Sequence, residues 1–384
     1  MSAGDRRASR TGSGSGLAGG PIPSLDGLRA ISVALVFFSH GGLENLVPGA
    51  LGVTVFFVLS GFLITTLMRE EYAARGSVSF RAFYLRRFLR LMPPLMIVTC
   101  LAVTLSFMTT LGSPFTPTGL MSVLLYFSNY FRIVHGVSGL PPGLAVTWSL
   151  AIEEHYYLLY PPLALALLKF RRPMFSAATL TALCALILAW RCWLKLHGAS
   201  EDHLSMGTDT RVDAILFGCL LAMIRNPWLD AVPAPDRTRD LGLAAACLGL
   251  LLATLLWRSE FFRLTFRYTA QCLAIAGLLY LAVARARSAP FRWLNTRPLV
   301  YLGAVSYTVY LSHYLVLMWA QAYASALGVV GVVAVAAVVT LGIASVMREW
   351  VEKPCAALRR RLHHALVVSP PPAARVIAGA HDAP

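Results

Sequence analysis

Long apolar runs alternate with short polar and basic segments along almost the whole chain. A helix needs roughly 20 apolar residues to cross the hydrocarbon core of a bilayer. Ten runs come close to that length: 26–45, 50–68, 91–112, 147–169, 174–195, 211–225, 239–257, 268–285, 299–322 and 327–348. The pattern predicts an all-α, polytopic transmembrane bundle of about ten spanning helices. The sixth run is short, and the apolar residues 119–131 are too few to span comfortably, so eleven is the alternative count.

Composition agrees with a membrane protein and suggests its boundaries. The chain is 57% hydrophobic and only 13% charged, whereas soluble domains carry about 25% charged residues. Residues 1–23 are rich in Arg, Ser and Gly and lack the apolar core of a signal peptide, so we expect a disordered cytoplasmic tail. Residues 24–356 are expected to form one transmembrane domain, and residues 357–384 a basic, then Pro/Ala-rich, cytoplasmic tail.

The positive charge follows the predicted loops. The 33 Lys and Arg residues exceed the 18 acidic ones and give a net charge of +15. With the N-terminus in the cytoplasm, most of them fall in inside segments, as the positive-inside rule requires. The outside segments then hold only Arg132, Arg191, Lys195, Arg211, Arg258, Arg263 and Arg267. This predicts cytoplasmic termini, a multi-pass protein of the inner membrane, and no nucleic-acid partner.

Motifs for metals, disulfides and bound nucleotides are missing from the sequence. The seven cysteines are scattered and form no Cys-x-x-Cys pair, and the nine histidines show no metal-binding spacing. The Gly/Ser run at residues 12–20 has neither a strand before it nor a lysine after it, so it is not a phosphate loop. We therefore expect no metal and no bound cofactor.

Arg29 and His40 are ionisable residues of the first apolar run, eleven positions apart. Their spacing corresponds to about 16 Å along a helix. Arg29 should lie near the inner face and His40 at or beyond the midplane. Ionisable groups inside a bilayer are costly unless they are paired or hydrated, and they usually mark function. These two residues are therefore the first candidates for catalysis.

A basic cluster precedes the third run, in the string YLRRFLRLMPP. Arg86 and Arg90 lie one helical turn apart, with Arg87 beside them. Forked guanidinium groups at a membrane surface suit phosphate groups. The alternative is a simple topology anchor or a contact with lipid headgroups.

Acidic residues begin the fourth run, where Trp148 and Glu153 occur in the string TWSLAIEEHYYLLYP. Aromatic residues there can form an interface belt, and the two adjacent glutamates can be a solvated pair. If Glu153 instead faces the bundle, it could reach His40, orient its ring and raise its basicity.

The sixth run starts with Asp209, Arg211 and Asp213, and Arg211 could pair with either carboxylate. We expect this cluster to converge on His40 in the outer half of the bundle and to support an acceptor. His313, in the ninth run, is either a supporting site residue or a packed histidine bonded to Ser306 or Tyr310.

Together these strings resemble the acyltransferase-3 family of membrane acyltransferases, over about Ser24 to Pro354. The resemblance implies that His40 and Arg29 are essential, and that Arg87 and Arg90 help engage the donor. His155 departs from the family, which more often has glutamine there. The matching strings are Arg29 with His40, GVTVFFVLSGFLI, Arg87 and Arg90 with Pro93, WSLAIEEHYYLLYP with Glu153 in the family's acidic position, TRVDAILFG, LGAVSYTVYLSHY and VEKP.

The resemblance also implies a reaction. Family members move acyl groups, commonly acetyl from acetyl-CoA, to hydroxyls of envelope sugars or secondary metabolites. We expect acyl-CoA as co-substrate, with its phosphates on Arg86, Arg87 and Arg90, and His40 as general base, either in direct transfer or in a relay across the bilayer. We also expect a stand-alone member without a hydrolase-like domain. The alternatives are acylation of a metabolite such as a macrolide, or a transporter; against the latter, no inverted repeat is visible.

Overall fold

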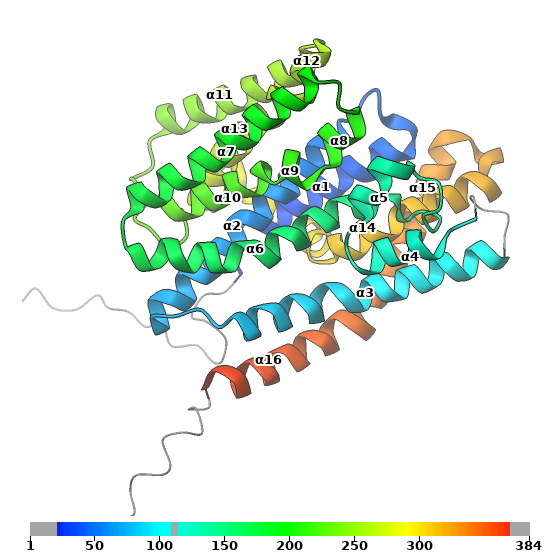
Figure 1. Ribbon diagram of the computed structural model, residues 1–384, viewed down its shortest axis with the longest axis horizontal. Helices are drawn as coiled ribbons and strands as arrows, with labels where there is room; N and C mark the ends of the chain where they lie inside the picture. Colours follow the sequence, from blue (N-terminus) through cyan, green and yellow to red (C-terminus); the bar gives the residue numbers. More distant parts are fainter. Residues whose placement is uncertain (1–20, 109–113, 369–384) are drawn as a thin grey trace, which may run out of the picture.

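The computed structural model describes residues 21–108 and 114–368, and this part of the chain is built from helices (Figure 1). One isolated bridge, between Phe115 and Gly139, is the exception to the helical pattern. Residues 1–20 of the expected N-terminal tail and residues 369–384 of the expected C-terminal tail lie outside the described residues, whereas residues 357–368 belong to helix α16 (Lys353–Val368). The helices are α1 Leu25–Phe38, α2 Gly49–Arg75, α3 Phe80–Met108, α4 Pro117–Leu124, α5 Ser128–His135, α6 Trp148–Phe170, α7 Pro173–Leu196, α8 Glu201–Met206, α9 Thr208–Arg211, α10 Asp213–Ile224, α11 Arg237–Leu256, α12 Glu260–Leu264, α13 Phe266–Ala284, α14 Arg297–Tyr323, α15 Gly328–Met347 and α16 Lys353–Val368.

A helix occupies each of the ten predicted runs. In the described part, seven helical stretches are long and apolar enough to cross a membrane: α2, α3, α7, α11, α13, α14 and the stretch Ser325–Leu362. This supports a multi-pass membrane protein. Helices α1 and α10 have only 14 and 12 residues, and polar residues lower the hydropathy of α6. Ten spans with cytoplasmic termini therefore stay a prediction. Residues 119–131 fall in the short helices α4 and α5, as expected.

The third helix begins before the predicted apolar run. The run starts at residue 91, where the charges stop, whereas α3 begins at Phe80 and continues through Pro93 and Pro94. The arginines that were expected ahead of the span are therefore part of the helix. Because α3 also packs along α16, as Figure 1 shows, basic residues of the C-terminal region lie beside them.

Glycines bring the central helices into backbone contact. A Cβ on Gly61 of α2 would lie 1.9 Å from the Ile215 carbonyl oxygen, and one on Gly218 of α10 would lie 2.0 Å from that of Val58. Such small-residue contacts are a main mode of helix packing in membranes. In the same way, a Cβ on Gly303 of α14 would lie 1.9 Å from the carbonyl oxygen of Asp26 in α1. These contacts fix α1 against α14 and α10 against α2.

Helix α1 ends in a wider turn that carries His40. The chain continues from Phe38 into the π-helix η1, Ser39–Leu43. Gly42 then adopts a φ of 94°, a conformation that glycine takes readily and other residues rarely take. Single π-helical turns often occur at functional sites. Here the turn ends the helix and places the His40 side chain at an exposed position.

Candidate functional site

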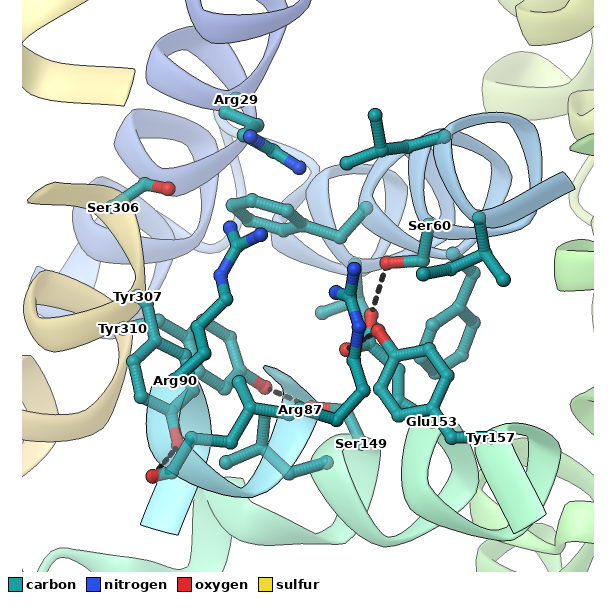
Figure 2. A pocket seen from close by; sticks show the side chains of 17 residues that line it. Arg29, Ser60, Arg87, Arg90, Ser149, Glu153, Tyr157, Ser306, Tyr307 and Tyr310 are labelled. Atoms are coloured by element: carbon teal, nitrogen blue, oxygen red, sulfur yellow. Dashed lines mark hydrogen bonds between the residues drawn. The ribbon is translucent and has the colours of Figure 1, made fainter. Parts of the chain in front are cut away.

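A cavity of about 70 Å³ lies at the centre of the bundle, among α1, α2, α3, α6 and α14 (Figure 2). Arg29, Arg87, Arg90 and Glu153 line it. The fold thus joins four predicted site residues from three separate predicted segments. We call this cavity the arginine pocket. Hydroxyl groups complete its polar lining: Ser60, Ser149, Tyr157, Ser306, Tyr307 and Tyr310.

Positive charge exceeds negative charge in the arginine pocket. Its carboxylate, Glu153, accepts hydrogen bonds from Ser60 Oγ at 2.8 Å and from the Tyr157 hydroxyl at 3.3 Å. The Arg87 guanidinium lies 5.5 Å from the centre of the Tyr157 ring, and its buried Nε has no hydrogen-bond partner in the described part of the chain. Arg29 pairs with Asp26 at 3.3 Å, outside the cavity lining. Because buried charges need compensation, the pocket is suited to an anionic group.

A second cavity, of about 350 Å³, adjoins the first. Arg90, Ser306 and Tyr307 line both cavities. The other charged residues of its lining come from the turn after α15 and from α16: Arg348, Glu352, Lys353 and Arg359. We call it the basic cavity. Since Glu352 is its acidic residue, the basic cavity also carries excess positive charge.

His40 lines a third cavity, of about 440 Å³, between η1, α14 and α15. We call it the His40 cavity; its lining shares no residue with that of the arginine pocket. Nδ1 of His40 lies 2.8 Å from Nε2 of His313. Tyr310 connects the two regions, because it lines the arginine pocket while its ring lies 5.6 Å from that of His313. Its hydroxyl is held by Ser149 Oγ at 2.6 Å and by the Val146 carbonyl oxygen at 3.0 Å.

The predicted partners of His40 were wrong. The structure places Glu153 in the arginine pocket, and the hydrogen-bond partner of His40 is the His313 imidazole rather than a carboxylate. His313 is also not bonded to a hydroxyl, since its Nδ1 lies 2.6 Å from the backbone carbonyl oxygen of Tyr310. Trp148 packs edge-to-face on Phe57, with ring centres 6.4 Å apart, and does not line the pocket.

Arg86 is separated from the other two arginines. It forms an ion pair with the buried Glu71 of α2 at 3.1 Å, and Glu71 also accepts a hydrogen bond from the Ser79 backbone N–H at 2.9 Å. Arg87 and Arg90 line the arginine pocket, whereas Arg86 pairs with Glu71 and links α3 to α2.

The residues before and at the start of α10 have partners on other helices. Asp213 forms a fully buried ion pair with Arg191 of α7 and accepts a hydrogen bond from Thr269 of α13 at 3.2 Å. Arg211 lies 3.8 Å from the centre of the Tyr268 ring and donates to Thr54 at 3.2 Å. The expected pairing of Arg211 with a carboxylate was therefore wrong.

Asp209 belongs to a separate polar group. It accepts hydrogen bonds from Trp190 Nε1 at 2.9 Å, His203 Nε2 at 3.0 Å and the Tyr130 hydroxyl at 3.2 Å. Burial, and then the Asp209 carboxylate, raise the pKa of Tyr130, so its hydroxyl stays protonated and donates. The expected convergence of this acidic cluster on His40 is not found, because these partners lie on α5, α7 and α8.

Comparison with known proteins identifies the family. The acyltransferase-3 family model, described as an acyltransferase domain, matches residues 22–349. The chain belongs to this family. The resemblance carried by the sequence strings is thereby confirmed, and the chain is placed among acyltransferases that do not transfer aminoacyl groups. No solved structure matches the chain.

Three similar proteins carry related names. A peptidoglycan O-acetyltransferase OatA of Listeria monocytogenes is 32% identical over 305 residues, which are 76% of this chain and 49% of that protein. An O-acetyltransferase OatA of Staphylococcus aureus is 29% identical over 79% of this chain and 51% of its own length. A putative peptidoglycan O-acetyltransferase YrhL of Bacillus subtilis is 32% identical over 77% and 49%. The chain thus spans about half the length of these relatives.

Several lining residues had no role in the sequence-based prediction. Ser60 and Tyr157 lie inside the family-like strings but were not singled out, although both bond to Glu153. Arg359 was counted only as part of a basic tail, yet it lines the basic cavity. Between residues 21 and 368, gap excepted, no group of three or more His, Cys, Asp or Glu residues has a metal-binding arrangement.

Proposed function

We propose that this chain transfers an acyl group, typically acetyl, from acyl-CoA to a hydroxyl of a cell-envelope glycan. One observation carries the proposal: the arginine pocket and the basic cavity adjoin each other and share Arg90. Together they form two compartments of different size. Such a pair of compartments suits a long donor that has an anionic end. Two of the relatives are named peptidoglycan O-acetyltransferase, the second with the word putative, and these names support a glycan acceptor.

The basic cavity would hold the phosphate end of the donor. Guanidinium groups bind phosphate through two parallel hydrogen bonds, and Arg348 and Arg359 line this cavity with Lys353. The arginine pocket, at about 70 Å³, fits only a small group. We therefore assign it to the thioester end of the donor, with Arg90 between the two parts.

The membrane orientation follows from the same charges. The basic cavity lies at the end of the bundle where α16 packs along α3. Basic segments favour the cytoplasmic side, and acyl-CoA is a cytoplasmic metabolite. We accordingly assign this end to the cytoplasm and the protein to the inner membrane, with both termini inside.

His40 would act as general base on the acceptor. Its Nε2 takes the proton of the acceptor hydroxyl while that oxygen attacks the thioester carbonyl carbon. The carbon–sulfur bond then breaks, and the CoA thiolate recovers the proton from the imidazolium. Positioned base catalysis of this kind contributes about 10²–10⁴-fold, and holding donor and acceptor together lowers the barrier further.

The separation of the cavities sets a requirement for this reaction. The thioester must pass Tyr310 to reach His40, because Tyr310 lies between the arginine pocket and His313. The Tyr310 hydroxyl is held by two hydrogen bonds, so passage requires these bonds to open. Direct transfer to the acceptor then occurs at the His40 cavity, without a covalent acyl-enzyme.

The proposal is tested with purified protein in liposomes, labelled acetyl-CoA and a soluble oligosaccharide of N-acetylhexosamines. We expect ester-linked label on the oligosaccharide that depends on both acetyl-CoA and His40. Label that appears on extracted small metabolites of the host cell and never on glycan would point to a metabolite acceptor. Solute flux independent of acetyl-CoA, without covalent product, would contradict the proposal in favour of a transporter.

A further inference from the structure

The buried ring of His313 has a defined protonation pattern. The side chain is fully buried in α14, and its Nδ1 lies 2.6 Å from the backbone carbonyl oxygen of Tyr310. A carbonyl oxygen can only accept a hydrogen bond. Nδ1 of His313 must therefore carry a proton and donate it to Tyr310.

The other nitrogen of His313 faces His40. Its Nε2 lies 2.8 Å from Nδ1 of His40, and the two ring planes differ by only 8°. If His313 were an imidazolium, its charge would be buried without compensation, because neither ring has a carboxylate within ion-pair distance in the described part of the chain. An uncompensated buried charge is strongly unfavourable. His313 is therefore neutral, and its Nε2 offers a lone pair.

We propose that His313 is a positioning residue that holds His40 in its Nδ1–H tautomer. The lone pair on His313 Nε2 accepts the proton of His40 Nδ1, so Nε2 of His40 is left unprotonated. The hydrogen bond on one ring nitrogen decides which form the other takes. His40 lines its cavity with an exposed side chain, and its Nε2 has no hydrogen-bond partner among the described residues. The unprotonated Nε2 of His40 is thus available to the His40 cavity, where the hydroxyl that receives the acyl group would lie.

The position of His40 in the chain explains why such an anchor is needed. His40 belongs to the short π-helical turn η1, in which Gly42 has a positive φ, whereas His313 lies in the middle of the long helix α14. Contacts with a rigid element reduce the freedom of an exposed side chain. The chain of hydrogen bonds from the Tyr310 carbonyl through His313 to His40 therefore fixes both the tautomer and the direction of the His40 ring.

Two substitutions separate this role from simple packing. His313→Gln keeps an acceptor oxygen that can reach His40 Nδ1, whereas His313→Phe keeps the ring and removes the acceptor. If the ring only packs against Phe37, Tyr310 and Tyr314, phenylalanine is the better replacement in this buried site. The proposal, which rests on the proposed acyl transfer, predicts instead that the glutamine variant is more active than the phenylalanine variant.

The kinetic test measures acetyl transfer to the oligosaccharide with each variant in liposomes. We expect the phenylalanine variant to lose kcat by about tenfold or more, up to the full 10²–10⁴-fold that base catalysis contributes, with an unchanged KM for acetyl-CoA. The glutamine variant should retain most of kcat. A phenylalanine variant with wild-type kcat, or equal loss in two properly folded variants, would overturn the proposal.

A spectroscopic measurement depends neither on activity nor on the folding of the His313 variants. Nitrogen-15 NMR of full-length protein with labelled histidine, in liposomes at neutral pH, distinguishes the two neutral tautomers. A His40→Gln sample identifies the His40 signal by its loss. We expect a protonated Nδ1 in His40 of the native protein. An Nε2–H form would overturn the proposal, whereas an Nδ1–H form without any acyl transfer would reject the proposed function alone.

Discussion

The ring of Tyr310 lies 5.6 Å from the ring of His313, and this contact joins two otherwise separate parts of the proposed site. On one side lie the arginines around Glu153, and on the other lies His40 with its own cavity. Because donor-binding and base groups are thus separated in space, substitutions in the two parts should change different kinetic constants.

Replacement of the proposed base should reduce the chemical step. In His40→Ala, we expect kcat for acetyl transfer to fall by at least about 10²-fold, the lower end of general-base catalysis, while acetyl-CoA still binds. The control is His197→Ala, an exposed histidine beyond the end of α7. Initial rates in liposomes and a separate measurement of acetyl-CoA binding check this. Full activity of His40→Ala would remove His40 from the mechanism.

Arg90 should affect donor recognition, because it lines both the arginine pocket and the basic cavity. Loss of a hydrogen bond to a charged group costs about 1.5–3 kcal/mol, so we expect the KM for acetyl-CoA to rise by about tenfold or more in Arg90→Ala. Arg81→Ala is the matched control, since Arg81 is an exposed arginine on the same helix. Equal KM values for the two variants would show that Arg90 has no part in donor binding.

The basic cavity predicts a salt-dependent KM. Partly exposed charges are screened by salt, with a Debye length of about 10 Å at 0.1 M and 3 Å at 1 M. The KM for acetyl-CoA should therefore rise with ionic strength in the native protein. In Arg359→Ala, which removes one lining cation, KM should start higher and rise less steeply. Parallel salt curves for the two proteins would argue against phosphate binding in this cavity.

Arg86 should contribute to stability rather than to catalysis. Its partner Glu71 has a side chain that is only 2% exposed, and removal of one partner of a buried pair costs about 3–5 kcal/mol. Arg86→Ala should lower the Tm in detergent while the KM of the folded protein stays unchanged. The double variant Arg86→Met with Glu71→Leu should recover much of the lost stability. A normal Tm with a raised KM in Arg86→Ala would instead show that Arg86 takes part in donor binding.

Hydropathy was sufficient to predict where ten long helical segments lie, because bilayer thickness sets the length of an apolar run. It could not predict which residues meet between helices. Arg86 and Arg87 are neighbours, yet one pairs with Glu71 and the other faces the arginine pocket. Which of the two faces the pocket depends on the rotation of α3 about its axis, and the apolar pattern around Pro93 and Pro94 does not define that rotation.

The hydrogen-bond partner of His40 is a second contact between helices that the sequence pattern could not predict. A carboxylate was the expected partner, since Glu153, Asp209 and Asp213 lie near the predicted outer ends of the fourth and sixth runs. The observed partner, His313, is brought to His40 by the close contact of α1 with α14, which depends on Gly303 beside Asp26. Such backbone contacts depend on glycine, which has no side chain. A reading of the sequence for ionisable and polar side chains therefore does not predict them.

The most direct test of the central claim is mass spectrometry of a soluble N-acetylhexosamine oligosaccharide incubated with the liposome-embedded protein and acetyl-CoA. The account predicts a product heavier by one acetyl group, removed by mild alkali, formed by the native protein and the His197→Ala control but not by His40→Ala. Product formation at equal rates by native protein and His40→Ala, at equal protein levels, would contradict it.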